Sequence, residues 1–294
     1  MLYTEPHSGP TPIVQVIRAA RRQVAIDAYE LDDTAVIDAI AAAVHHGVTV
    51  QVILAPRPKG RPVGWAREEF HRLAVTGAEV RWSPYRFSHR YAIDHAHIVV
   101  DDQGRGPCLV DSENLTWRAI FHARGNLWIS HDPVVNNALA QVFDADWLRQ
   151  HVGRDPRRIL LVSPSKSRPL AHLLLQSGPV DLEARKFGYL PRIIHALERK
   201  GREARVILPA TLSRYDHANL KGVLGAGVQV RYLRGLNIQG TMIAGPTQGF
   251  VGSQNLSWSV LHSSRDVGIV LRGHSVGALR AAFDRDWRRA SPVA

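Results

Sequence analysis

The chain has 294 residues, 45% of them hydrophobic, and its 37 Lys and Arg against 26 Asp and Glu give a formal net charge of +11. This composition argues against disorder and predicts a folded protein whose surface attracts nucleic acid, anionic lipid or phosphorylated small molecules. Cys108, the single cysteine, excludes an intrachain disulfide and a cysteine-based zinc cage. Because no apolar run reaches the roughly 18 residues of a membrane span, we expect a cytoplasmic protein.

Helix and strand patterns alternate along the chain. Apolar periodicity predicts, in order, a helix at 13–22, a strand at 24–28, a helix at 34–45, a strand at 48–54, a helix at 189–200, a strand at 204–208 and a closing helix at 275–287. Glycines at positions 47, 77, 201 and 227 are predicted to end helices. This alternation predicts an α/β fold with a mixed or mostly parallel sheet flanked by helices.

Four segments of the first half recur in the same order in the second half. They are 46–54 and 200–208, 77–82 and 227–232, 111–117 and 252–258, and 143–147 and 283–287. The sharpest match pairs Asp-Ser-Glu-Asn-Leu-Thr-Trp with Gly-Ser-Gln-Asn-Leu-Ser-Trp. We infer a duplication that produces two pseudo-symmetric lobes, residues 1–152 and 153–294, joined within residues 151–158.

Two histidines are the first candidates for chemistry. His95 and His97 lie two residues apart in an expected strand, so both project from one face, and a turn with Ser112 and Asn114 follows. A neutral histidine can attack phosphorus or move a proton at neutral pH. The alternative is that both are hydrogen-bonded histidines without a chemical role, in a chain that has fifteen histidines.

These residues resemble the motifs of the phospholipase D superfamily, whose halves each carry His-x-Lys-x4-Asp and then a Gly-Ser-x-Asn turn. His95 stands at the family's His, His97 at its Lys, Asp102 at its structural Asp, and residues 111–114 at its turn. The resemblance extends over residues 14–287 and implies two phospholipase D-like lobes that face each other across one active site.

The second half departs from the family pattern. Gln239 stands where the family has His and Thr241 where it has Lys, although the Gly-Ser-Gln-Asn turn at 252–255 is intact. The resemblance implies that one His forms a phosphohistidine, the other protonates the leaving oxygen, and the Lys and Asn residues bind phosphate. We therefore expect a catalytic pair, His95 and His97, and a phosphate-binding set, Ser112, Asn114, Gln239, Thr241, Ser253 and Asn255.

Three functions are compatible with these residues. The first is a phosphodiesterase or phosphoryl transferase without a cofactor, in which His95 is the nucleophile and His97 or Gln239 assists the leaving group. In the second, His95, His97 and an acid such as Asp94, Asp111 or Glu113 bind a divalent metal. The third is a catalytically inactive scaffold that binds a phosphate backbone. The expected substrate is a phosphodiester, nucleic acid rather than a phospholipid head group, and the expected state is a monomer.

Aromatic residues near these motifs allow further expectations. Trp117 and Trp258 follow the two turns, and because they repeat we expect them to anchor the core. Trp82, Tyr85 and Phe87 interleave with arginines at positions 81, 86 and 90. Such a mixture of rings and cations stacks on bases or packs as a lid over the site.

Overall fold

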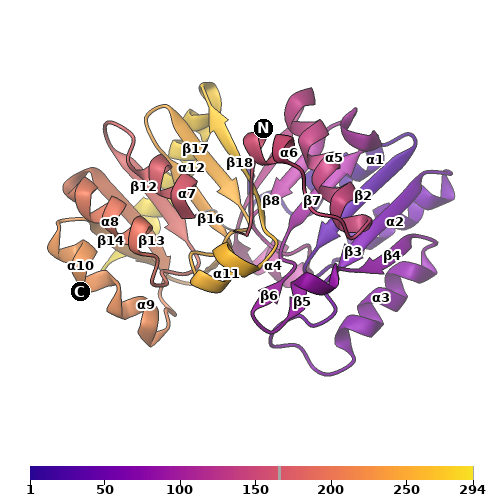
Figure 1. Cartoon of the computed structure of the whole chain (residues 1–294), viewed down its shortest axis with the longest axis horizontal. Helices are drawn as coiled ribbons and strands as arrows, with labels where there is room; N and C mark the ends of the chain where they lie inside the picture. The colour runs from indigo at the N-terminus through magenta and orange to yellow at the C-terminus, as the bar shows by residue number, and fades with distance from the viewer. Residues whose placement is uncertain (165–166, 294) are drawn as a thin grey trace.

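A computed structural model describes residues 1–164 and 167–293. It contains two large β-sheets with helices packed around them, one from each half of the chain (Figure 1). The first half, drawn in indigo to magenta, and the second, drawn in orange to yellow, lie side by side. The predicted α/β fold with two similar lobes is confirmed.

The first lobe is built on a seven-stranded mixed sheet. Its spatial order is β1 (Leu2–Thr4), β10 (Asn126–Ser130), β8 (Cys108–Asp111), β7 (His97–Asp101), β2 (Gln23–Ala28), β3 (Thr49–Leu54) and β4 (Glu79–Trp82). Strands β2, β3 and β4 are parallel, and the other pairings are antiparallel. The helices of this half are α1 (Thr11–Ala19), α2 (Thr34–His45), α3 (Trp65–Val75), α4 (Trp117–His122), α5 (Pro133–Trp147) and α6 (Arg154–Ile159).

The second lobe repeats this strand order and adds one edge strand. The order is β11 (Leu160–Val162), β18 (Val267–Arg272), β17 (Gln248–Gly252), β16 (Thr241–Ala244), β12 (Val180–Ala184), β13 (Ala204–Pro209), β14 (Gln229–Leu233) and β19 (Ser291–Pro292). Its helices are α7 (Ser167–Leu174), α8 (Pro191–Lys200), α9 (Arg214–Ala218), α10 (Leu220–Gly225), α11 (Trp258–Ser263) and α12 (His274–Arg289).

Short elements connect the two lobes. Strand β15 (Asn237–Ile238) of the second lobe pairs in parallel with β9 (Ala123–Arg124) of the first. A small hairpin of β5 (Ser88–His89) and β6 (Ala92–Ile93) precedes the His95 segment. Among the described residues, 3-10 turns are found at η1 (Tyr85–Phe87), η2 (Asp102–Gly104) and η3 (Gly201–Glu203).

The observed elements agree with the predicted ones to within a few residues, and the largest difference is in the first helix. It begins at Thr11 rather than residue 13, because Pro12 is pre-organised for a first turn. It ends at Ala19 rather than residue 22, because the Asp102 carboxylate accepts the backbone N–H groups of residues 21, 22 and 23 at 2.7–3.3 Å. Asp102 therefore has a structural role, holding the start of β2 beside the end of β7.

Residues of both lobes share one apolar core. Ile98 of the first sheet and Val251 of the second belong to the same buried cluster, together with Phe143 of α5 and Phe283 of α12. Two further clusters fill the outer part of each lobe. Because burying one large apolar side chain contributes roughly 1.5–3 kcal/mol, this shared cluster stabilises the two lobes against each other.

Two buried ion pairs cross between the lobes in a reciprocal arrangement. Arg265 of the second lobe pairs with Asp146 of α5 at 2.6 Å, and Arg124 of the first lobe pairs with Asp286 of α12 at 2.6 Å. The two carboxylates come from the repeated segments 143–147 and 283–287. These segments therefore fasten each lobe's closing helix to the opposite lobe, and so fix the seam at which the site lies.

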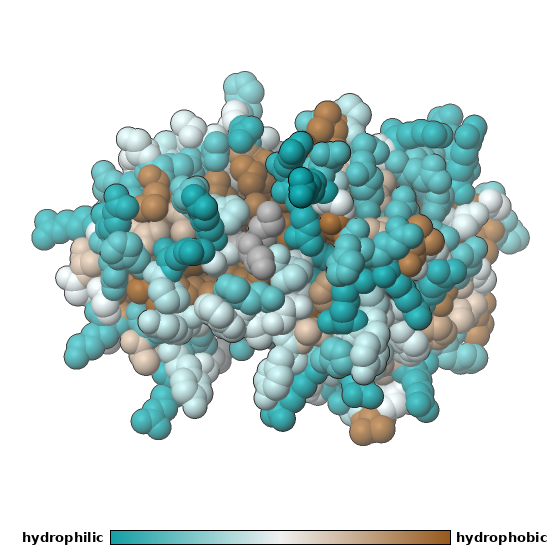
Figure 2. All heavy atoms as spheres, viewed as in Figure 1, coloured by the Kyte–Doolittle hydropathy of each residue, from teal (hydrophilic) through white to brown (hydrophobic). Residues whose placement is uncertain are grey.

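The outer surface is largely hydrophilic on the face shown in Figure 2, with apolar patches between the polar side chains. Within the described ranges, no helix combines the length and apolar character needed to cross a bilayer.

Candidate functional site

The His95 segment is held by the backbone of the opposite lobe. The His95 N–H donates to the carbonyl of Arg265 at 2.8 Å, and the Arg265 N–H donates to Ile93 at 2.9 Å. In the other lobe, the Gln239 N–H donates to the carbonyl of Arg124 at 2.9 Å. The His95 segment is thus held by Arg265, which follows the turn of the second lobe, and the Gln239 segment is held by Arg124, which follows the turn of the first lobe. Both segments therefore lie at the seam between the lobes.

A buried carboxylate orients the His95 ring. Nδ1 of His95 lies 3.1 Å from Oδ1 of Asp266, and the Ser253 hydroxyl donates to the same oxygen at 3.2 Å. Burial raises the pKa of Asp266, whereas the hydrogen bonds from His95 and Ser253 and the charge of Arg265 oppose this. With its Nδ1 proton directed at Asp266, His95 keeps the Nε2 lone pair for attack on an electrophile.

His97 lies beside His95 and is neutral at physiological pH. The two ring centroids are 4.7 Å apart, so the structure brings the predicted pair together. His97 is fully buried, and neither ring nitrogen has a hydrogen-bond partner in the described part of the chain. Burial, and then the charges of His95 and Arg185, lower the pKa of His97 well below its usual range. His97 therefore does not supply the positive charge of the family's lysine.

Arg185 supplies a positive charge at this point, and the sequence motifs did not reveal it. The residue directly follows β12, and its guanidinium donates a hydrogen bond to the side-chain oxygen of Gln239. After burial and the charge of His95, the charge of Arg185 is a third cause that lowers the pKa of His97, while burial lowers the pKa of Arg185 itself. The guanidinium fork suits phosphate oxygens.

The sheet registers show why Arg185 reaches the site. Ala28 at the end of β2 pairs with His97, and Ala184 at the end of β12 pairs with Thr241. These matched registers make Thr241 the structural equivalent of His97, as the sequence predicted. They also make Arg185 the equivalent of Tyr29, because each follows the last residue of its strand.

Tyr29 and Glu30 form the first-lobe wall of the site. The Tyr29 ring lies 5.0 Å from the His95 ring, centroid to centroid, and the backbone N–H of Lys59 donates to the Tyr29 hydroxyl oxygen. Glu30 accepts a hydrogen bond from the Asn114 amide at 2.9 Å and pairs with Arg61 at 2.6 Å. The loop between β3 and α3 is thereby tied to the predicted phosphate-binding Asn114.

The predicted phosphate-binding residues are placed differently from one another. The Ser112 hydroxyl accepts the Asn126 N–H at 2.8 Å, and the Thr241 hydroxyl donates to the carbonyl of Gln254 at 2.5 Å, so both hydroxyls bond to backbone. Ser253 bonds to the acid that orients His95. The side-chain oxygen of Asn255 is buried and has no partner within the described ranges.

The acid proposed as a third metal ligand lies with other carboxyl groups. The Asp111 carboxylate accepts the Glu113 N–H at 3.1 Å, and burial, followed by the charge of Glu5, raises its pKa. In the part of the chain that the structure describes, no three His, Cys, Asp or Glu side chains gather as a group able to hold a metal ion.

The site is one-sided, because the second lobe's acid is matched by a glycine in the first. Gly125 follows Arg124 just as Asp266 follows Arg265. A Cβ at Gly125 would lie 2.4 Å from the Glu113 carboxyl carbon, so a side chain at position 125 requires Glu113 to move. In the first lobe, the carboxyl group at this point belongs to Glu113 rather than to residue 125.

The expectation that Trp117 and Trp258 anchor the core is wrong. Their side chains are 54% and 61% exposed at the first positions of α4 and α11. The interleaved arginines near residue 85 are partly engaged within the fold, since Arg86 pairs with Asp146 at 2.8 Å and Arg81 lies over the Trp147 ring at 4.1 Å. Repetition marked equivalent positions correctly but did not separate core from surface.

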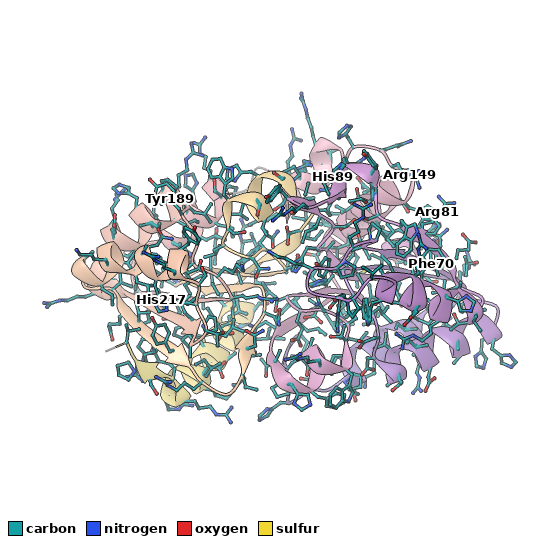
Figure 3. The ribbon with its side chains drawn as sticks, turned by 90° about the horizontal axis from the view of Figure 1, so that it is seen from below. Phe70, Arg81, His89, Arg149, Tyr189 and His217 are labelled. Carbon is teal, nitrogen blue, oxygen red and sulfur yellow. The ribbon has the colours of Figure 1, made fainter. Side chains whose placement is uncertain are left out.

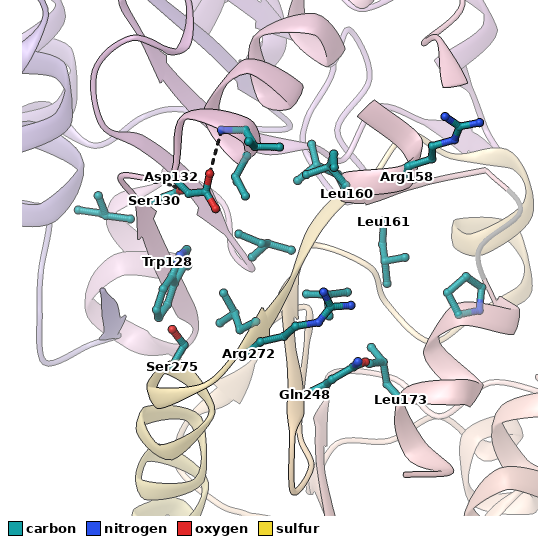
Figure 4. Close-up of a pocket in the computed structure, with 18 of the residues that line it drawn as sticks. Trp128, Ser130, Asp132, Arg158, Leu160, Leu161, Leu173, Gln248, Arg272 and Ser275 are labelled. Atoms are coloured by element: carbon teal, nitrogen blue, oxygen red, sulfur yellow. Dashed lines mark hydrogen bonds between the residues drawn. The ribbon is translucent and has the colours of Figure 1, made fainter. Parts of the chain in front are cut away.

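Two cavities lie away from His95. One of about 710 Å³ is lined by both lobes, with Trp128, Leu160, Leu173 and Leu271 among apolar lining residues and Arg158 and Arg272 among polar ones (Figure 4). Another of about 320 Å³ lies in the first lobe, with Arg57, Tyr85, His89 and Arg149 in its lining. Neither includes the residues of the His95 cluster.

Comparisons with known proteins agree with the motifs. Residues 13–147 match the sequence model of a family described as cardiolipin synthase, PLD-like domain. The chain is similar to polyphosphate kinase from Porphyromonas gingivalis, with a TM-score of 0.74 at 12% identity, over 100% of this chain and 48% of that one. It is similar to phosphatidylserine synthase from Haemophilus influenzae, with a TM-score of 0.73 at 12% identity, over 99% and 87%.

A third solved structure, a mutant of yeast tyrosyl-DNA phosphodiesterase, has a TM-score of 0.51 at 12% identity, over 87% of this chain and 84% of that one. At these identities the likeness is one of fold. The chain spans about half the length of the polyphosphate kinase. No curated protein matches its sequence.

Proposed function

We propose that the chain is a phospholipase D-like enzyme, as the family match over residues 13–147 supports, and that it cleaves a phosphodiester through a covalent intermediate on His95. The observation that carries this proposal is the bond from His95 Nδ1 to Asp266, which leaves Nε2 as a nucleophile, while the charge of Arg185 acts on the neighbouring His97. Asp266 acts as a positioning residue, holding the tautomer and stabilising the ring when it becomes positively charged.

The reaction proceeds in two displacements. In the first, Nε2 of His95 attacks phosphorus, an N–P bond forms, the P–O bond to the leaving group breaks, and the departing oxygen takes up a proton. In the second, a water oxygen attacks phosphorus, the N–P bond breaks, and the proton lost by water passes to the base that gave one up. The resting enzyme and a phosphomonoester result.

Arg185 takes the charge role of the missing lysines. Its guanidinium offers two parallel N–H donors to non-bridging phosphate oxygens, and burial strengthens that attraction. Asn114 and Asn255 add amide donors from the two turns. The expected effect of Arg185→Gln is a loss of roughly 10²–10³-fold in cleavage rate, as for removal of one strong transition-state donor.

We assign the leaving-group proton to Tyr29 rather than to His97 or Gln239. The lowered pKa of His97 keeps its ring neutral at neutral pH, and the N–H of a neutral imidazole, like the amide of Gln239, is too weak an acid to protonate the leaving oxygen. The Tyr29 hydroxyl oxygen accepts from Lys59, so its own proton stays available, and burial raises its pKa. Tyr29→Phe should therefore slow cleavage of a diester with a poor leaving group far more than cleavage of a nitrophenyl diester.

A second candidate function is a scaffold that binds phosphates without cutting them. The observation that favours it is the loss of the second lobe's histidine together with its acid, at Gln239 and Gly125. In either case the +11 charge favours nucleic acid over a phospholipid head group. The mechanism above uses one chain and no metal, so we propose a monomer whose cleavage persists in the presence of a chelator.

The test is cleavage of bis(p-nitrophenyl) phosphate with chelator present, by wild type, His95→Ala and the control His71→Ala, which removes an exposed histidine of α3. We expect cleavage by wild type and the control only, with an acid-labile phosphoryl adduct on His95 in quenched samples. Equal background from all three proteins would refute the histidine nucleophile, and retained binding of oligonucleotide would then favour the scaffold.

A further inference from the structure

The two exposed tryptophans have matched positions beside the catalytic seam. Trp117 begins α4 three residues after Asn114, and Trp258 begins α11 three residues after Asn255. Figure 1 shows α4 and α11 where the two lobes meet, and α11 packs near β6, just before the His95 segment. The indoles are thus related by the same pseudo-symmetry as the two turns, and each begins the helix that follows its turn.

Histidine rings fix the orientation of both indoles. Trp258 stacks on His262 with centroids 3.8 Å apart and planes 12° apart, and Trp117 lies 4.6 Å from the His122 ring. The His262 ring is itself held, because its Nδ1 lies 3.0 Å from the carbonyl of Trp258. More than half of each indole remains exposed. Such pre-oriented aromatic surfaces bind planar ligands with little loss of side-chain entropy.

The chemistry of the two helices favours bases over acyl chains as the occupant. Their aliphatic side chains Ile120, Val260 and Leu261 are buried, so the large apolar side chains that remain exposed on them are aromatic, Trp117, Phe121 and Trp258. A helix that inserts into a membrane presents an aliphatic face as well. Aromatic rings spaced along a basic surface are instead the arrangement that binds single-stranded nucleic acid.

Neighbouring groups extend this surface. Arg118 is exposed directly after Trp117, and Tyr189, 70% exposed, follows Gly188, whose N–H donates to the Leu256 carbonyl at 2.7 Å. That bond holds Tyr189 close to the segment leading to α11. Figure 3 labels Tyr189 on the second lobe and His89 and Arg149 on the first. Arg118 thus adds a basic side chain next to Trp117, and Tyr189 adds an aromatic side chain near the segment leading to α11.

We propose that Trp117 and Trp258 form a paired base-stacking site for single-stranded nucleic acid, in which bases on either side of the phosphate at His95 stack on the two indoles. This proposal rests on the function proposed above, since it assumes that a backbone phosphate occupies the His95 site. The proposed binding surface lies outside the family motifs. Because the two indoles are related by pseudo-two-fold symmetry, we expect a strand to bind in either 5′-to-3′ direction.

Binding of short oligo(dT) and oligo(U) to the full chain, followed by tryptophan fluorescence and by anisotropy of a labelled strand, tests the proposal. We expect Trp117→Ala and Trp258→Ala each to weaken binding about 5- to 100-fold, and the phenylalanine variants to retain most of the affinity. Tyr215→Ala, which removes an exposed aromatic ring on α9, serves as control and should bind like wild type.

Salt dependence separates stacking from charge. The slope of log K against log salt should be unchanged in the tryptophan variants and reduced by about 0.7 in Arg118→Gln. Wild-type affinity in both tryptophan variants overturns the stacking site while leaving His95-dependent nitrophenyl diester cleavage intact. If the tryptophan variants lose binding to anionic phosphatidylglycerol vesicles but keep wild-type affinity for oligonucleotide, the base-stacking site is overturned in favour of a membrane-binding surface. Weakened oligonucleotide binding without His95-dependent cleavage would keep the stacking site and reject the catalytic function.

Discussion

Replacing Arg124 by methionine is expected to destabilise the protein more than the same change at Arg265. Both arginines are buried, at 3% and 1% exposure, and each pairs at 2.6 Å with a carboxylate of the opposite lobe. Methionine keeps much of the apolar stem and removes the charge, so the comparison isolates the ion pair. The difference arises from the groups that each substitution leaves behind.

Arg265→Met leaves Asp146 with a second cation, because Arg86 donates to Asp146 at 2.8 Å. Arg124→Met leaves the carboxylate of Asp286 with no second cationic partner among the described residues. Breaking a buried pair from one side costs roughly 3–5 kcal/mol. We therefore expect a loss of about 3 kcal/mol in the free energy of unfolding for Arg265→Met and about 5 kcal/mol for Arg124→Met.

Urea unfolding followed by both tryptophan fluorescence and far-UV circular dichroism measures these losses. Arg158→Met is the control, because the pair of Arg158 with Asp155 is largely exposed and should contribute nothing measurable. Adding Asp286→Leu to Arg124→Met should recover part of the loss, since no unpaired carboxylate remains. Equal losses for the two arginine variants, or separate transitions for the two probes in wild type, would refute a seam fastened by reciprocal pairs.

Three further predictions concern single side chains. Burial raises the pKa of Glu69 from 4.5 to about 8, so the folded protein holds a proton that the unfolded chain has released between these values. Stability from this group therefore falls as pH rises through that window, by at most about 1.4 kcal/mol per pH unit, and Glu69→Gln should flatten the profile of melting temperature against pH. Asp266→Asn should lower His95-dependent cleavage roughly 10²–10⁴-fold with unchanged circular dichroism, because it favours the wrong tautomer; a loss of less than tenfold would contradict the role of Asp266. Gln239→His alone should leave the rate of nitrophenyl diester cleavage unchanged, and an increase would contradict the one-sided site.

Local signals in the sequence were sufficient to predict the fold. Gly47 follows a helix and has a φ value of 80°, which a glycine adopts without strain, so the strand after it begins within one residue of the predicted start. The repeated segments 143–147 and 283–287 both lie in the C-terminal parts of helices, α5 and α12. Their role in fastening the lobes was not predictable, because Asp146 and its partner Arg265 are 119 residues apart and no local pattern links them.

The candidate site was predictable only where a motif marks it. The sequence predicted that His95 and His97 lie together, and their rings are 4.7 Å apart. Arg185 lies outside every motif, and the one available signal was its place after a strand equivalent to the one before Tyr29. Asp266 likewise lies outside the motifs, and its bond to His95 crosses between lobes, so no local pattern in the sequence links the two residues.

The losses in the second motif form a physically coupled set. His95 has Asp266 as its carboxylate partner, whereas the equivalent position for residue 239 is Gly125, where a side chain would require the buried Glu113 to move. Glu113 is fully buried, and burial, followed by the charges of Asp111 and Glu5, raises its pKa. A new histidine would therefore be neither oriented nor reliably charged. Restoring a second catalytic group requires changes at 239, 125 and 113 together, whereas Arg185 already provides positive charge from the same lobe.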